Sequence, residues 1–449
     1  MNNALLLDLY ELTMGESYFL YKEKTLATFE LFVRELPHNR NYLVACGLED
    51  ILNYIKDLRF NKEDLKFLRS TKLFSEEFLS YLKNFRFRGD IWAMPEGTIC
   101  FAQEPIIRVT APIIEAQLVE SFLLNTINLQ TMIASKASRV VTAAGKRKVY
   151  DFSLRRTHGQ DAAIKASRAS YIAGTSGTSN VLAAKLYAIP VSGTMAHSFV
   201  MSFRQEIDSF LAYADTFPER SILLVDTYNT AKGIDNAVKV GLYLKEKGYR
   251  LQGIRLDSGD IVYLSVLARR ALDEAGLGYV KIFATGNLDE FKIRSLIKKG
   301  SKADSFGVGT NMGTSIDAPS LDVIYKLSEV TGEEARFLPT MKLSKGKATY
   351  PGRKQVYRQK KMGIFVKDIL GLEDEKIEGI PILKKIVVKG KICYRPLSLE
   401  KIRAGLQKEI LRFPAGLRGV DSVFKYPIAI SPRLKSMRDS LLAQLKKRQ

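Results

Sequence analysis

The sequence has few of the residues that build disulfide frameworks and histidine-based metal sites. It contains three cysteines (Cys46, Cys100 and Cys393) and three histidines in 449 residues. Cysteines this few and this scattered form neither a disulfide framework nor a zinc-binding pattern. The sequence therefore predicts no disulfide framework, zinc site or histidine-rich metal site, and a reducing cytoplasm is the expected compartment.

Long apolar segments are also missing. No run of about 18 apolar residues occurs, which excludes a membrane-spanning helix of the usual kind. The first residues, Met1 to Asp8, carry no basic stretch before their leucines, so they do not read as a signal peptide. No membrane partner is expected.

Several familiar catalytic and nucleotide-binding motifs are absent as well. The chain has no G-x-G-x-x-G after a strand, no G-x-x-x-x-G-K-[ST], no G-x-S-x-G and no H-E-x-x-H. Any nucleotide must therefore be bound by other loops.

Positive charge is abundant. The chain has 69 Lys and Arg against 48 Asp and Glu, a formal net charge of +21. Nucleic-acid binding, a general basic bias and a site for several phosphate groups each account for this excess. No helix-turn-helix, zinc-finger spacing or RNP-type strand supports the first, so nucleic acid is kept only as a remote alternative.

The middle of the chain alternates short apolar segments with helical stretches. Each segment ends in polar residues or glycine, and each is followed by a helical pattern. Six of the segments begin near Val149, Ile189, Ile222, Leu251, Val280 and Ser305, and a further short segment ends at residues 176–179. Strands that alternate with helices indicate a parallel sheet, and about seven such units predict an irregular (β/α) barrel whose chemistry lies at the strand ends.

The flanking regions differ from this pattern. Residues 27–33 read as a strand, and a long helix is expected to begin at Pro112. We expect an α/β protein with three parts: residues 1–125 as an N-terminal α+β part, 126–325 as the barrel with the active site, and 326–449 packing on the N-terminal part to form one discontinuous domain.

Two strand ends carry groups suited to phosphate and ribose. Residues 305–310 (Ser-Phe-Gly-Val-Gly-Thr) place glycines where backbone N–H groups can cradle phosphate, although a tight turn would also need them. Residues 255–260 (Arg-Leu-Asp-Ser-Gly-Asp) combine a guanidinium with carboxylates that can hold Mg²⁺ or ribose hydroxyls, or simply cap a helix.

Two further strand ends suggest a reactive base and an aromatic site. His197 follows the segment at Ile189, where an imidazole can act as base or nucleophile, and Asp226 at the next strand end is a plausible orienting carboxylate. Residues 152–156 (Phe-Ser-Leu-Arg-Arg) offer an aromatic face and guanidinium groups, which suit a flat anionic ring.

Taken together, these segments resemble the nicotinate phosphoribosyltransferase family over essentially the whole chain. The resemblance rests on motifs in the same order as in the family, including residues 8–14 (Asp-Leu-Tyr-Glu-Leu-Thr-Met), 152–156, 193–199 (Gly-Thr-Met-Ala-His-Ser-Phe), 225–230 (Val-Asp-Thr-Tyr-Asn-Thr), 254–260 and 305–310. The resemblance implies transfer of phosphoribose from 5-phosphoribosyl 1-diphosphate (PRPP) to nicotinate, with Mg²⁺, and ATP hydrolysis coupled through a phosphohistidine. It also implies a homodimer with shared active sites.

The resemblance assigns roles residue by residue. His197 is similar to the phosphohistidine, with Asp226 and Asp257 as catalytic carboxylates. Residues similar to those of the nicotinate site are Tyr10 (from the partner subunit), Phe152, Arg155, Ser179, Thr194 and Arg255. Those similar to the PRPP and phosphate site are Gly286, Asn287, Gly309 and Thr310.

Ser179 bears on the choice of substrate. The nicotinamide-using relative has an Asp at the corresponding place, which would accept a hydrogen bond from a carboxamide and repel a carboxylate. Ser179 therefore favours nicotinate. A nicotinamide-type or quinolinate-type transferase is the alternative within the same class.

Overall fold

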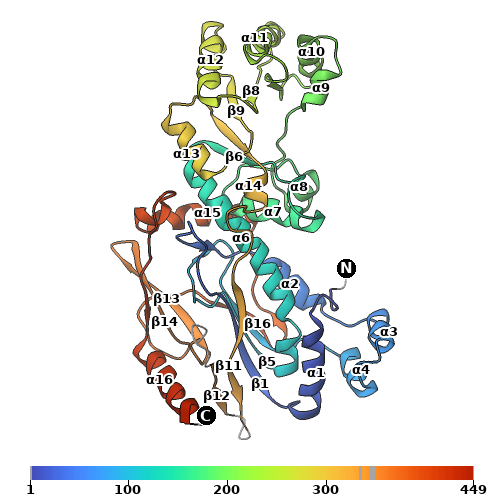
Figure 1. Ribbon diagram of the computed structural model, residues 1–449, viewed down its shortest axis with the longest axis vertical. Helices are drawn as coiled ribbons and strands as arrows, with labels where there is room; N and C mark the ends of the chain where they lie inside the picture. The colour runs from blue at the N-terminus through green and yellow to red at the C-terminus, as the bar shows by residue number, and fades with distance from the viewer. Residues whose placement is uncertain (1–2, 333–335, 343–348, 448–449) are drawn as a thin grey trace. The chain divides into compact units, whose positions relative to one another are not determined.

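The computed structural model describes residues 3–332, 336–342 and 349–447 (Figure 1). The chain divides into two compact units. Unit 1 comprises Met1–Met132 with Ser320–Gln449, and unit 2 comprises Ile133–Pro319. Among the helices in the described ranges, none is long and apolar enough to cross a membrane. The predicted boundaries at 125/126 and 325/326 fall inside α6 (Glu120–Ala144) and β11 (Val323–Thr331), respectively.

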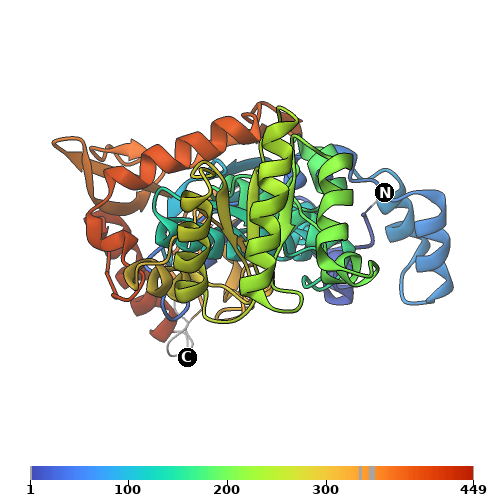
Figure 2. The same cartoon turned by 90° about the horizontal axis from the view of Figure 1, so that it is seen from above.

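Unit 2 contains a five-stranded parallel sheet with the order β6-β10-β9-β8-β7. Its elements after α6 are β6 (Lys148–Asp151), α7 (Gln160–Ile172), α8 (Val181–Tyr187), α9 (His197–Met201), α10 (Glu206–Thr216), β7 (Ile222–Leu224), α11 (Thr230–Glu246), β8 (Gly253–Leu256), α12 (Ile261–Glu274), β9 (Lys281–Ala284), α13 (Glu290–Lys298), β10 (Ser305–Val308) and α14 (Thr310–Gly313). Helices α10, α11 and α12 lie side by side (Figure 1, Figure 2).

The sheet continues beyond β6 through single parallel bridges from Asp151 to Thr178 and from Thr178 to Val191. The seven predicted segments thus lie side by side in cyclic sequence order, as a barrel requires. Between Val191 and β7, however, no backbone pairing closes the ring within residues 133–319. The α/β class is confirmed, whereas the irregular (β/α) barrel is not confirmed.

Unit 1 is built from mostly antiparallel strands and surrounding helices, and β14 pairs with β18 in parallel. A seven-stranded sheet has the order β12-β11-β1-β5-β3-β16-β17, a four-stranded sheet has the order β15-β13-β14-β18, and β2 pairs with β4. Besides β11, the elements are α1 (Leu9–Tyr21), β1 (Leu26–Val33), β2 (Leu43–Val44), α2 (Leu48–Asp57), α3 (Lys62–Ser70), α4 (Glu76–Lys83), β3 (Asp90–Ala93), β4 (Ile99–Cys100), β5 (Ile107–Pro112), α5 (Ile113–Gln117), β12 (Phe337–Pro339), β13 (Lys354–Lys361), β14 (Ile364–Leu372), β15 (Ile380–Pro381), β16 (Lys384–Val388), β17 (Lys391–Ile392), α15 (Leu399–Glu409), the short 3₁₀ helices Ile410–Arg412 and Ala415–Arg418, β18 (Ile428–Ile430) and α16 (Pro432–Lys447).

The helix expected to begin at Pro112 is two helices. Pro112 is the last residue of β5 and caps α5, which ends at Gln117, and α6 starts at Glu120. The apolar spacing continues across the break, so the pattern did not reveal it.

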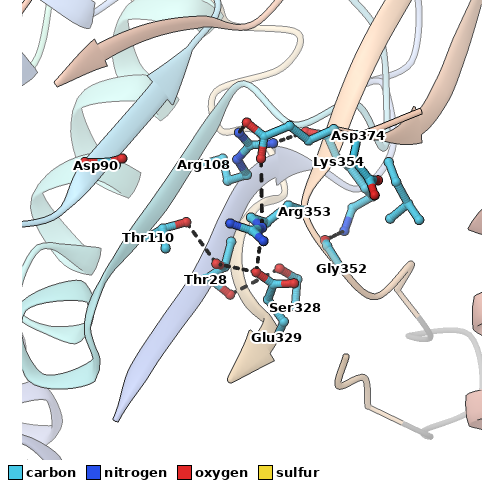
Figure 3. Close-up of polar contacts among 12 residues, drawn as sticks. Thr28, Asp90, Arg108, Thr110, Ser328, Glu329, Gly352, Arg353, Lys354 and Asp374 are labelled. Atoms are coloured by element: carbon cyan, nitrogen blue, oxygen red, sulfur yellow. Dashed lines mark hydrogen bonds and ion pairs between the residues drawn. The ribbon is translucent and has the colours of Figure 1, made fainter. Parts of the chain in front are cut away.

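Polar side chains are buried between the two larger sheets of unit 1. Lys354 donates from its backbone N to Glu30 Oε1 at 2.8 Å, and its Nζ lies 2.6 Å from Glu30 Oε2. Nearby, Glu329 accepts from Thr28 at 3.0 Å and pairs with Arg353 at 2.9 Å (Figure 3). Burial lowers the pKa of Lys354, and the charge of Glu30 opposes that shift. The strands of this unit are therefore joined by paired charges as well as by apolar packing.

Candidate active site

A pocket of about 800 Å³ lies at the C-terminal ends of the parallel strands of unit 2. Nearly all the residues predicted for the site line it: Phe152, Arg155, Ser179, Thr194, His197, Arg255, Asp257, Gly286, Asn287, Gly309 and Thr310. Asp226 and Tyr10 are the predicted residues outside this lining. Because parallel strands end at one edge, residues distant in sequence meet here.

Arg255, at the end of β8, is held by three polar neighbours. Its Nε donates to Thr285 Oγ1 at 2.9 Å and its Nη1 to Thr194 Oγ1 at 3.0 Å. Its Nη2 lies 2.6 Å from Asp257 Oδ1. The guanidinium plane is therefore fixed in the pocket before any ligand arrives, which is suited to reading a planar anion.

Phe152 supplies the aromatic wall. Its ring stacks on Phe283 with centroids 5.6 Å apart, and the Arg255 guanidinium lies 5.8 Å from its centroid. A Cβ at Gly307 would meet the Phe152 ring at 2.8 Å, so glycine is needed for the ring to lie there. The half-buried ring leaves a face toward the pocket that can accept a flat heterocycle.

Asp257 is kept ionised. Although burial raises its pKa, hydrogen bonding from Thr285 and the charge of Arg255 together lower the pKa below the usual value. Its second oxygen, Oδ2, lies 3.8 Å from His197 Nε2. A fixed negative charge thus faces both the imidazole and the open pocket.

His197 is the first residue of α9, and 41% of its side chain is exposed. Its Nδ1 lies 3.1 Å from Thr227 Oγ1. The predicted orientation of His197 by Asp226 is wrong: the neighbouring Thr227 makes the contact instead, because the Asp226 side chain is turned toward residues 257 and 258. Nε2, on the other side of the ring, is the nitrogen directed to Asp257 and the pocket.

Asp226 instead supports the adjacent strand end. Its Oδ2 accepts hydrogen bonds from the backbone N of Asp257 at 3.0 Å and from Ser258 Oγ at 2.6 Å. Its Oδ1 is buried and has no hydrogen-bond partner in the structure. Asp226 therefore positions Asp257 and leaves one oxygen free for a further partner.

The carboxylates at this site suit a Mg²⁺ ion that substrate phosphate groups also bind. In the part of the chain that the structure describes, no three His, Cys, Asp or Glu residues gather into a metal-binding group. Mg²⁺ commonly uses one or two carboxylates together with substrate phosphates. Asp226, with its unpartnered Oδ1, and Asp257 fit that arrangement.

The glycine-containing loops have tightly defined backbones. Gly286 has φ of +98°, and a Cβ there would collide with the carbonyl oxygen of Asp257. Asn311, in α14, donates to the carbonyls of Asn287 at 3.2 Å and Leu288 at 3.1 Å. These hydrogen bonds therefore join the loop that contains Gly286 to the loop that contains Gly309.

The sequence predicted no role for three of these supporting residues: Thr227, Thr285 and Asn311. Each lies in the short polar stretch directly after a predicted strand, which was the only signal for them. Their roles depend on which neighbour each hydroxyl or amide contacts, and spacing in the sequence does not specify that.

Tyr10 and Ser179 complete the predicted set. Tyr10 lies on α1 in unit 1, where 44% of it is exposed, and burial and the carboxylates of Glu120 and Glu11 raise its pKa. Its hydroxyl is therefore neutral. Ser179 is half-buried, and its backbone N donates to Asp151 O at 2.9 Å.

The fold and pocket together define an α/β protein whose strand-end pocket is lined by guanidinium groups, an aromatic ring and glycine-containing loops. Comparison with known proteins specifies the family. Residues 5–128 match the nicotinate phosphoribosyltransferase N-terminal domain, and residues 147–355 match the nicotinate phosphoribosyltransferase family. The chain belongs to the nicotinate phosphoribosyltransferase family.

Individual relatives agree with this assignment. The chain is 46% identical over 433 residues to nicotinate phosphoribosyltransferase pncB2 of Mycobacterium tuberculosis, covering 96% of this chain and 92% of that protein. It is 37% identical over 474 residues to nicotinate phosphoribosyltransferase of Bacillus subtilis, covering 98% and 95%.

Two solved structures share the fold. Human nicotinic acid phosphoribosyltransferase matches with a TM-score of 0.86 at 28% identity, covering 97% of this chain and 99% of that one. Nicotinate-nucleotide pyrophosphorylase from Pyrococcus furiosus matches with a TM-score of 0.73 at 26% identity, covering 91% and 95%.

Proposed function

We propose that this protein transfers phosphoribose from PRPP to nicotinate, giving nicotinate mononucleotide and pyrophosphate. The observation that carries the proposal is the fixed group formed by Arg255, Phe152 and Asp257 in the strand-end pocket. It offers a cation for a carboxylate, a ring face for a pyridine and an anion for the ribose. The family of the chain supports the same reaction.

In this mechanism the pyridine ring lies against Phe152, and its carboxylate is bound by Arg255 and Arg155. The ring nitrogen attacks the anomeric carbon of PRPP, and the bond to the diphosphate oxygen breaks, so pyrophosphate leaves with the electron pair. The nitrogen is already nucleophilic, and catalysis comes from positioning and charge. Asp257 stabilises the positive charge that develops on the ribose.

The phosphate groups are bound by the loops. Gly309 and Thr310 would hold the 5-phosphate, with Gly286 and Asn287 along the ribose side. Mg²⁺, held by Asp257 and Asp226 together with the diphosphate, would neutralise charge on the leaving group. Tyr10 of a second subunit would cover the open face of the pyridine in a homodimer.

ATP hydrolysis is coupled through His197 in this proposal. Nε2 attacks the γ-phosphorus of ATP, ADP leaves, and water later hydrolyses the phosphohistidine to release phosphate. Thr227 at Nδ1 and Asp257 near Nε2 support this geometry. The phosphorylated ring would order the site for PRPP, and its hydrolysis would drive turnover.

His197→Ala tests the coupling. In this variant ATP should no longer stimulate transfer, and the protein should no longer acquire acid-labile label from γ-labelled ATP. Slow, ATP-independent transfer should remain. Thr227→Val is the matched variant, which keeps the imidazole and should reduce labelling only in part. Complete loss of transfer in folded His197→Ala protein that still binds PRPP would contradict a purely coupling role.

A further inference from the structure

A buried cluster of charges lies behind the two loops that line the pocket. Lys136 Nζ, from α6, lies 2.6 Å from Glu290 Oε2 and 2.8 Å from Asp317 Oδ1. Arg139, also on α6, lies 3.0 Å from Glu290 Oε1. The side chains of Lys136 and Glu290 are 1% and 0% exposed, and that of Asp317 is 23% exposed. All of these residues belong to unit 2.

The two carboxylates follow the pocket loops along the chain. Glu290 is the first residue of α13, immediately after the loop that contains Gly286 and Asn287. Asp317 follows α14, which begins at Thr310. One ammonium group on α6 therefore holds the segments that follow both loops.

Asn311 joins the same two loops on the pocket side. It is 6% exposed and donates to the carbonyls of Asn287 and Leu288. Asn287 itself has φ of +50°, a left-handed conformation that needs support from its surroundings. Its carbonyl also accepts from Lys292 Nζ at 2.9 Å.

The physical effect of the cluster is rigidity. Buried ions hold a narrow geometry, because separating them leaves an uncompensated charge away from water. Lys136 and Arg139 face Glu290 and Asp317 here, so the buried charges are paired. The loops can thus keep their backbone N–H groups in place without a ligand, which reduces the ordering cost of binding an anion.

We propose that Lys136 is a positioning residue that acts through Glu290 and Asp317 to hold the Gly286 and Gly309 loops in their phosphate-binding conformation. The ligand of these loops is a sugar phosphate, and this inference rests on the proposed function. Lys136 itself touches no substrate.

Asp317→Ala tests the proposal at the most exposed member of the cluster. The KM for PRPP should rise about tenfold, whereas the KM for nicotinate should change less than twofold. Asp317→Asn, which keeps an oxygen for Lys136, should recover part of the loss. Asp273→Ala is the control: it removes a surface ion pair with Arg269 and should alter neither KM.

Calorimetric binding of ribose 5-phosphate gives a readout that does not need turnover. The dissociation constant should rise about tenfold in Asp317→Ala and stay unchanged in Asp273→Ala. Lys136→Arg should bind more tightly than Lys136→Met. Equal binding by wild type and folded Asp317→Ala, or no binding by wild type, overturns the proposal. Binding with the expected losses but no conversion of nicotinate would instead reject the proposed function alone.

Discussion

Arg255 and Ser179 show how single side chains shape the substrate site. Arg255 has its orientation set by Thr194, Thr285 and Asp257, so the cation is fixed in place. Ser179 adds no charge of its own to the lining. The lining therefore combines a fixed cation at Arg255 with an uncharged side chain at position 179.

Ser179→Asp should change the preference between acid and amide. The new carboxylate would repel nicotinate and accept from the amide of nicotinamide, shifting the kcat/KM ratio toward nicotinamide by about 10²-fold. Steady-state kinetics with both bases measures this ratio. Ser176→Asp adds the same charge outside the pocket lining and should leave the ratio unchanged; an equal shift in both variants would argue against a contact at position 179.

Burial of the Glu11 carboxyl should make the folding stability of the protein depend on pH. Glu11 is 0% exposed, and burial raises its pKa from 4.5 to about 7, against hydrogen bonds from Ser121. A carboxyl with a raised pKa in the folded state binds more protons folded than unfolded. Its destabilising contribution therefore grows as pH rises from about 4.5 to about 7, and is complete above that range.

Glu11→Gln should remove this effect. The variant should gain about 1–3 kcal/mol of unfolding free energy relative to wild type at pH 8, and much less at pH 5. Urea unfolding at the two pH values measures the difference. Glu76, whose pKa is lowered by its hydrogen bond from Arg69, is the contrasting control, because Glu76→Gln should lose stability at the higher pH. A Glu11→Gln gain that is equal at both pH values would contradict the assignment.

At the scale of elements, strand-end loops carry most of the site, and their glycines are placed by close approaches. Gly286 needs both a positive φ and the missing Cβ, because Asp257 O lies against it. Gly248, between α11 and β8, has a positive φ of +83° but nothing near its Cβ position. Comparing alanine substitutions at Gly286 and Gly248 therefore separates the effect of a steric collision from the effect of backbone strain.

Gly286→Ala should therefore cost more than Gly248→Ala. Backbone strain costs about 1 kcal/mol in each variant, and the collision adds about 1–3 kcal/mol in Gly286→Ala only. Transfer activity should fall at least tenfold in Gly286→Ala and remain near wild type in Gly248→Ala. Thermal unfolding and kinetics on both variants measure the two effects. Equal losses would mean that the close approach to Asp257 is relieved without cost.

The sequence predicted these elements well where periodicity carries the signal. All seven predicted barrel segments lie in barrel order, because apolar runs ending in polar residues are a local pattern. The break between α5 and α6 and the absence of backbone pairing between Val191 and β7 were not predictable, because both depend on how the elements pack and not on a local sequence pattern. Likewise, strand ends identified His197, but the contact with Thr227 rather than Asp226 depends on side-chain direction.

At the scale of the whole molecule, the chain carries a formal net charge of +21. Much of it is unrelated to the pocket, since lysines and arginines occur throughout both units. Binding to RNA through diffuse charge alone would depend steeply on salt. Retention on single-stranded RNA should fall at least tenfold between about 0.05 and 0.2 M salt, as measured by filter binding. Binding that persists at the higher salt would support the nucleic-acid alternative.

The most direct test of the proposed function is product formation from labelled nicotinate, PRPP and Mg²⁺, with and without ATP, and with nicotinamide in parallel. The account predicts nicotinate mononucleotide and pyrophosphate, formed faster with ATP, and little product from nicotinamide. Product from nicotinamide alone would contradict the role of Ser179, and transfer to neither base would contradict the proposed function.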